Sequence, residues 1–230
     1  MADHKGQYAI QCSLVSIFLL AGLFLSGAAS AGGEADRVLA DLRQPVWQEY
    51  LASPEWVARY TSDSSVSTLS SLIFNRGIHW KIRIRVLQLL GATLNPKGIA
   101  PLAEMLTDPA LNSDCPALKW NSAFALGNFR SNPAARTFLL AALKKESNTV
   151  VREGIIDSLG KIGDAGVVPA LLPLLSDGSF AIRLSAVKAL GKIGGEGAVS
   201  SLRGLLETDT DPYIRYETAA ALKRLGAARS

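Results

Sequence analysis

The heptapeptide DSLGKIG at residues 157–163 returns almost unchanged as KALGKIG at residues 188–194, which is 31 positions further along the chain. Its Leu-Gly pair marks four positions of the repeat in the same register, at Leu90-Gly91, Leu126-Gly127, Leu159-Gly160 and Leu190-Gly191. The spacings are 36, 33 and 31 residues, and Leu222 follows 32 residues after the last pair. We call these five leucines the marker leucines. Recurrence at this period indicates a structural unit repeated along the chain.

Each marker leucine lies in a segment with the pattern of an amphipathic helix. VVREGIIDSL, FAIRLSAVKAL and PYIRYETAAAL place apolar residues at three- and four-residue intervals, which forms one face of a helix. Residues that favour helix N-caps precede these segments, at Asn148, Ser179 and Asp211. A basic residue also stands seven positions before every marker leucine, at Arg83, Lys119, Arg152, Arg183 and Arg215.

A second helix is predicted in each unit after a short glycine-containing turn. Gly160 and Gly191 suit the left-handed C-terminal cap of the first helix, and Pro101 or Pro169 fits the first turn of the second. Pro173 predicts that its helix starts late or bends. The Gly-Lys pairs of the heptapeptides are therefore helix ends. They do not form a phosphate loop, because the upstream glycine spacing and the following Ser or Thr are missing.

A two-helix unit of this length cannot bury its own apolar face, whereas stacked units share one continuous core. The predicted fold is therefore all-α, an α-solenoid of stacked two-helix repeats. Residues 32–79 are expected to form a degenerate helical pair that caps the N-terminal end. The repeats occupy residues 80–230, with units near 80–110, 111–147, 148–178 and 179–210 and a partial unit at 211–230.

The pattern N/D-x-x-V/I-R-x-x-A-x-x-A-L-G-x-I-G, over about residues 80–226, resembles the HEAT-like repeat family, particularly the short type found in phycobilin lyase subunits. The resemblance implies a protein-binding scaffold and says little about activity. It also implies that the basic column ties adjacent units together, by bonding turn aspartates or helix-end carbonyls. Iron-binding HEAT-like hydroxylases carry paired His-Glu motifs, and the absence of any His-Glu dipeptide excludes that subclass.

The first 31 residues are interpreted as an export signal. A short polar start precedes a long uncharged run, and Ala29-Ser30-Ala31 matches the small-x-small pattern of a cleavage site. The alternative is an uncleaved anchor at residues 9–26, a run near the lower length limit of a spanning helix. We therefore expect a periplasmic or secreted protein, attached to a membrane only if that segment is retained.

Few groups suited to catalysis remain after residue 31. His79 and Cys115 are the remaining histidine and cysteine, too few for a His-based triad or a Cys/His metal site. His79 is predicted at a helix start, and Cys115 at a helix start or in the core. Asp177 and Asp209 lie in turn sequences, where turn formation and helix capping are the expected roles. We predict no catalytic residue, no metal site and no cofactor, and hence no enzyme.

Two sets of surface residues are candidates for partner binding. Basic residues two positions after the marker leucines accumulate in the last three units, forming a basic ridge of Lys161, Lys192 and Arg224. The second helices are expected to line the concave surface, with polar candidates at Glu104, Arg136, Arg203 and Glu207. A solvated edge without a partner is the alternative for the ridge. The tryptophans, Trp47, Trp56, Trp80 and Trp120, are expected in the core, with a binding patch as the alternative.

Three functions are compatible with these features. The favoured one is an exported, non-catalytic scaffold that binds another protein through its concave surface and the basic ridge. The alternative is a bilin-lyase-like accessory factor that holds a chromophore or a modified protein, although an export signal argues against it. A nucleic-acid binder is disfavoured, because the net charge is only +4 and residues 32–110 hold eight acidic and eight basic side chains.

Overall fold

The computed structural model describes residues 33–113, 115–130 and 132–226, which contain helices and no strand. The chain divides into two compact units, Met1–Gly33 and Glu34–Ser230, and the described helices belong to the second. The predicted export signal (residues 1–31) and anchor (residues 9–26) lie outside the described residues. Within the described ranges, no helix is long and apolar enough to cross a membrane. The all-α solenoid prediction is confirmed.

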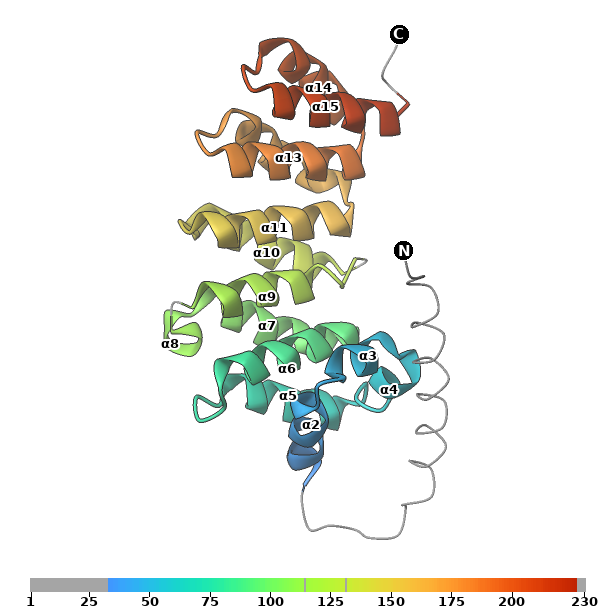
Figure 1. Cartoon of the computed structure of the whole chain (residues 1–230), viewed down its shortest axis with the longest axis vertical. Helices are drawn as coiled ribbons and strands as arrows, with labels where there is room; N and C mark the ends of the chain where they lie inside the picture. Colours follow the sequence, from blue (N-terminus) through green and yellow to red (C-terminus); the bar gives the residue numbers. More distant parts are fainter. Residues whose placement is uncertain (1–32, 114, 131, 227–230) are drawn as a thin grey trace, which may run out of the picture. The chain divides into compact units, whose positions relative to one another are not determined.

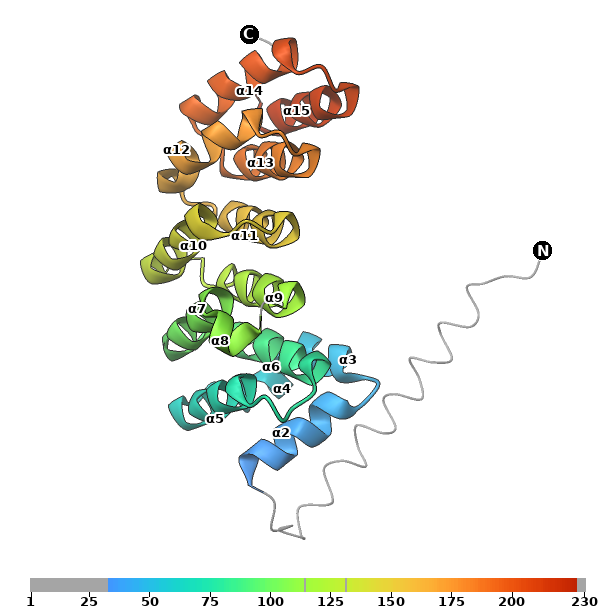
Figure 2. The same cartoon turned by 90° about the vertical axis from the view of Figure 1, so that its left-hand side faces the viewer.

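The repeat helices of the second unit form two layers, which Figure 2 shows side by side. One layer contains the first helices: α6 (Trp80–Ala92), α9 (Pro116–Leu126), α11 (Thr149–Ile162), α13 (Phe180–Ile193) and α15 (Pro212–Arg224). The other contains the second helices: α5 (Asp63–Phe74), α7 (Ile99–Thr107), α10 (Pro133–Lys145), α12 (Val168–Leu171) and α14 (Glu196–Thr208). The units follow one another along the stack in chain order (Figure 1).

One apolar core runs through the whole stack. Four of the marker leucines have no exposed surface, and the fifth, Leu222, is 2% exposed. The core is continuous from Val38 in the N-terminal region to Leu222 in the last helix. Each two-helix unit thus buries its apolar face against the next unit.

The glycines after the marker leucines are buried contact points between neighbouring first helices. A Cβ atom at Gly91 would lie 2.6 Å from the Cβ of Ala125, and one at Gly160 would lie 2.8 Å from the Cα of Ala189. Gly127 approaches Ser158, and Gly191 approaches Ala221, similarly closely. Each of these four partners directly precedes a marker leucine, so every unit places glycine against a small residue of the next.

The prediction that Gly160 and Gly191 are left-handed C-terminal caps is wrong. Both lie inside α11 and α13. The positive φ angles occur three residues later, at Gly163 and Gly194, each with φ +74°. Glycine is favoured at these two positions because an L side chain would be strained there.

The helix starts and the second helices follow the sequence signals closely. Asn148 and Asp211 are N-caps whose side chains accept backbone N–H bonds, whereas the Ser179 N-cap makes no such side-chain bond. Pro173 interrupts its helix as expected. The four-residue α12 passes into the 3₁₀ helix η3 (Leu172–Ser176), because proline supplies no backbone N–H to continue the α-helical ladder.

The basic column lies at the turns between units. Arg152 donates to the Asp177 carboxylate at 3.0 Å, and Arg183 to that of Asp209 at 3.2 Å. Arg83 and Arg215 donate to backbone carbonyls instead, of Ile73 and Leu111 and of Asp209, respectively. Lys119 forms an ion pair with Glu146 at 3.3 Å. Each base therefore connects its helix start to a turn or helix end of the stack.

The N-terminal region contains more segments than the helical pair that the sequence indicates. It comprises α2 (Glu34–Arg43), α3 (Trp47–Ala52), α4 (Pro54–Ala58) and then α5. Ser53 ends α3 and caps α4, accepting a bond from the Trp56 N–H, and Pro54 begins the new helix. Ser-Pro at this point breaks what the periodicity alone indicates as one helix.

The glycine contacts predict opposite effects for two Gly-to-Ala substitutions. Gly160→Ala should lower the free energy of unfolding by roughly 1–2 kcal/mol, because the new Cβ overpacks the backbone of α13. Gly204→Ala in α14 is the matched control, since no atom lies within 4 Å of its added Cβ. It should raise stability by about 0.5–1 kcal/mol through helix propensity. Urea unfolding measures both, and a stabilised Gly160→Ala protein would contradict the contact.

The turn aspartates predict loss of stability in acid. The Ser179 backbone N–H, followed by Arg152, holds the pKa of Asp177 below its ordinary value. Its carboxylate therefore contributes stability above about pH 4, and this contribution is lost as the pH falls through the lowered folded-state pKa. Asp177→Asn should cost about 1 kcal/mol at pH 7 and progressively less below pH 4. Urea unfolding of the wild type and the variant, at pH 7 and below pH 4, tests this. An equal loss of unfolding free energy under both conditions would refute it.

Candidate functional site

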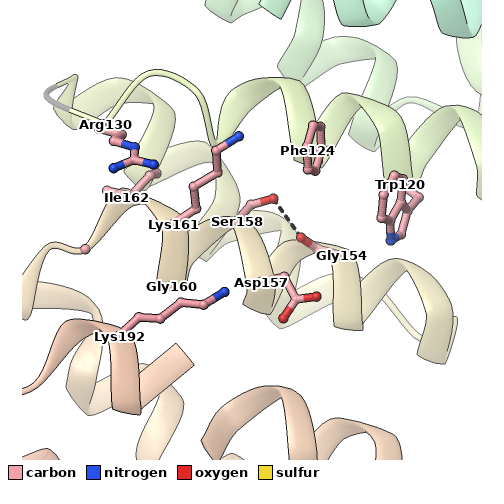
Figure 3. Close-up of a pocket in the computed structure, with 11 residues that line it drawn as sticks. Trp120, Phe124, Arg130, Gly154, Asp157, Ser158, Gly160, Lys161, Ile162 and Lys192 are labelled. Atoms are coloured by element: carbon pink, nitrogen blue, oxygen red, sulfur yellow. Dashed lines mark hydrogen bonds between the residues drawn. The ribbon is translucent and has the colours of Figure 1, made fainter. Parts of the chain in front are cut away.

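A cavity of about 480 Å³ opens between the first helices α9, α11 and α13. Figure 3 shows the side chains around it, with two aromatic rings on α9, a carboxylate on α11 and cationic groups from α11, α13 and the turn after α9. The lining includes Trp120, Phe124, Arg130, Asp157, Lys161 and Lys192. We call this cavity the first-layer cavity.

Its aromatic wall is built by two residues one helical turn apart on α9. The Trp120 and Phe124 rings are stacked, with centroids 5.5 Å apart and planes 10° from parallel. Phe124 is 40% exposed. Gly154 on α11 makes room for the indole, since a Cβ there would lie 2.4 Å from the Trp120 Cδ1 atom. The wall therefore depends on a glycine outside the column of glycines that follow the marker leucines.

The cationic end of the cavity centres on Lys161. Its ammonium lies 4.3 Å from the centroid of the Phe124 ring and donates a hydrogen bond to the Asn128 side chain. Asn128 in turn donates to the carbonyl of Gly91 at 3.1 Å. Burial, together with repulsion from Arg130 and Lys192, lowers the pKa of Lys161. Three positive charges therefore converge at this end.

Asp157 on α11 also lines the cavity, and Glu153 lies one turn before it on the same helix. Burial raises the pKa of Asp157, and Lys192 and Lys188 oppose that rise. Burial and the neighbouring Asp157 also raise the pKa of Glu153. Within the part of the chain that the structure describes, the Asp157 carboxylate accepts no hydrogen bond and forms no ion pair within 4.0 Å.

The structure separates the predicted binding residues into two groups. Lys161 and Lys192 line the first-layer cavity, and an Arg224 nitrogen lies 3.6 Å from the Cβ position of Gly191, next to Lys192. The basic ridge is therefore continuous over α11, α13 and α15. The other candidates belong to the second helices: Glu104 in α7, Arg136 in α10, and Arg203 and Glu207 in α14. The two groups do not share one surface.

The second helices carry a cavity of their own, also about 480 Å³, beside α10. Arg136 lines it and forms an ion pair with Asp164, while Lys144 and Lys145 contribute exposed positive charge. Arg136 is therefore already matched by a carboxylate.

Sequence reasoning missed Arg130, Trp120 and Asp157 as parts of one site. Arg130 lies in a turn outside every repeat column, and no spacing rule brings it to Lys161. The expectation that the tryptophans are core residues is correct for Trp56, which is 8% exposed, and wrong for Trp80, which is 44% exposed. The repeat register could have indicated a half-buried position for Trp120. Glu153 and Leu184 occupy the equivalent position in later units, and both are half-buried.

The other reactive side chains lie at helix starts. His79 is the N-cap of α6 and accepts the Lys81 N–H at 3.3 Å, and the half-buried Cys115 is the N-cap of α9. Among the described residues, no three His, Cys, Asp or Glu side chains are grouped so as to hold a metal ion.

The sequence matches a family model described as HEAT repeats over residues 109–171 and 136–223, which together span half of the chain. No curated protein matches the sequence.

Three solved structures illustrate the similarity in fold. The complex of CpcE and CpcF of phycocyanin lyase from Nostoc sp. PCC7120 gives a TM-score of 0.50 at 18% identity, covering 88% of this chain and 80% of that chain. An engineered protein gives 0.53 at 17%, with coverages of 86% and 98%. A designed armadillo repeat protein in complex with the peptide (KR)4 gives 0.50 at 18%, with coverages of 84% and 100%.

Proposed function

The chain belongs to the HEAT repeat family, and from that premise we propose that it is an exported, non-catalytic scaffold that binds another protein. The binding surface is the layer of first helices, centred on the first-layer cavity and the basic ridge. The observation that carries the proposal is the combination, on this layer, of an aromatic wall with an excess of cationic over acidic side chains. Aromatic and arginine side chains of this kind are enriched where proteins bind one another.

The chemistry of the cavity favours binding over catalysis. Its lining residues include neither histidine nor cysteine. The Ser158 hydroxyl donates to the Gly154 carbonyl at 2.7 Å, as Figure 3 shows, so no base activates it as a nucleophile. The lining groups can therefore orient and hold a partner, but they lack the nucleophile–base pair of a hydrolytic centre.

Two of the three similar structures are complexes with another polypeptide. The CpcE chain is in complex with CpcF, and the designed armadillo protein with a (KR)4 peptide. Our proposal extends polypeptide binding to this chain, with a partner of its own.

A bilin-lyase-like accessory role is the second candidate. The aromatic wall beside three cations would suit a conjugated ligand that carries carboxylates, which is the observation in its favour. Visible absorbance that copurifies with the protein would support this role, and a colourless protein with a bound polypeptide supports the scaffold.

Charge reversal on the exposed part of the ridge tests the binding surface. We expect Lys192→Glu/Arg224→Glu to lose a specific protein captured from the native cell envelope, whereas Lys144→Glu/Lys145→Glu should retain it. The four side chains are all exposed, and each double variant changes the charge by the same amount. Loss only in the control pair would move the binding surface to the second helices. Capture of no protein by the wild type would contradict the scaffold.

Export is tested by the mass of the protein isolated from its own cells. Cleavage after Ala31 would leave a chain that begins at Gly32, recovered from the periplasm or the medium. Ala29→Leu/Ala31→Leu should block cleavage, because signal peptidase requires small residues at these positions. A full-length chain found in the cytosol would refute export, and a full-length chain in the membrane would identify residues 9–26 as an anchor.

A further inference from the structure

We propose that the first-layer cavity recognises a partner segment in which an acidic side chain stands next to an aromatic one. The acidic group binds among Arg130, Lys161 and Lys192, and the aromatic ring packs against Trp120 and Phe124. This inference rests on the proposed function and specifies the chemistry of the partner. It follows from three properties of the cavity. These are the charge of its cationic side chains, the exposure of its aromatic wall, and the position of the carboxylates on α11.

The lining of the cavity carries three cations and one carboxylate, Asp157, so positive charge is in excess. Elsewhere in the stack, several arginines are paired with carboxylates, as in Arg152 with Asp177 and Arg183 with Asp209. Arg130 and Lys192 form no ion pair with any side chain in the described ranges, and Lys161 bonds a neutral amide. A carboxylate placed between them would offset the mutual repulsion of three like charges, and it would be held by charge-assisted hydrogen bonds.

The apolar wall is open to a second ring. Phe124 is 40% exposed and Trp120 is half-buried, so parts of both stacked rings are accessible beside Lys161. Gly154 removes the side chain that would otherwise stand under the indole. An aromatic side chain can therefore stack on or meet the edge of these rings, as aromatic pairs do in interfaces.

The placement of the carboxylates favours a peptide over a polyanion. Glu153 and Asp157 lie on the same face as the cations, on the neighbouring turns of α11. A nucleic-acid strand or an anionic membrane would present further negative charges to them. A peptide presents backbone N–H groups instead, and the Asp157 carboxylate, which accepts no hydrogen bond within the described chain, can accept one.

Short peptides test the recognition directly on the full-length protein. The probes are Ac-Gly-Asp-Phe-Gly-NH₂ and Ac-Gly-Phe-Asp-Gly-NH₂, with Asn-for-Asp and Ala-for-Phe versions as controls. Binding is followed by the indole N–H signal of Trp120 in NMR, assigned with Trp120→Phe. We expect at least one probe to move this signal, and each control peptide to bind about tenfold more weakly.

Paired variants locate the binding. Lys161→Gln/Lys192→Gln should weaken the Asp-containing probe about tenfold, whereas Lys144→Gln/Lys145→Gln on the second helices should leave it unchanged. Gly154→Ala should displace the indole and weaken binding, while Gly204→Ala should not. Thermal unfolding of each variant shows that the fold is retained.

Several outcomes overturn the inference. They are equal binding of the Asp and Asn probes, equal binding to the Lys161→Gln/Lys192→Gln protein, or no binding of either probe. Tighter binding of an eight-residue oligothymidine or of phosphatidylserine vesicles at the same residues would also refute it, in favour of a polyanion. If the wild type still captures a ridge-dependent protein while the probes fail, this inference fails and the scaffold function stands.

Discussion

The close approach of glycine to a small residue sets the spacing between the first helices, and the rest of the stack depends on it. Gly160 against Ala189 and Gly191 against Ala221 leave no room for a side chain at the contact. Because core packing responds to a single methyl group, this contact defines how far apart successive units lie. The marker leucines are then buried at the same depth in every unit, which keeps one core continuous along the stack.

Polar contacts hold the turns between units. The basic residue at the equivalent position of each unit makes them, but its bonding partner differs from unit to unit. Arg152 and Arg183 reach carboxylates, whereas Arg83 and Arg215 reach backbone carbonyls. A guanidinium can serve both purposes because it carries several donors in a planar fork. The column is therefore conserved along the stack in position and charge while the local bonding differs. Structural ties of this kind leave the outer faces of the helices free for function.

The candidate site arises where the repeat is broken. Gly154 stands where neighbouring units carry larger side chains, so Trp120 can lie across α11 and open a cavity under a solvent-exposed aromatic wall. Lys161 and Lys192 extend the repeat register, but Arg130 comes from a turn. Regular residues thus build the frame, and irregular residues supply the binding chemistry. The combination explains how a structural repeat can hold a specific partner without a catalytic centre.

The sequence by itself determined the repeat, its helices, its N-caps and the interruption at Pro173, because all of these depend on residues close together in the chain. The left-handed cap was predicted at Gly160 and lies at Gly163. Either glycine fits the sequence pattern of a helix C-terminus, and only the observed end of the helix distinguishes them. Only the tertiary structure decided that Trp120, Arg130, Asp157 and Lys192 meet in one cavity. These residues come from three helices and a turn, and their proximity depends on the inter-helix spacing that the glycine contacts impose.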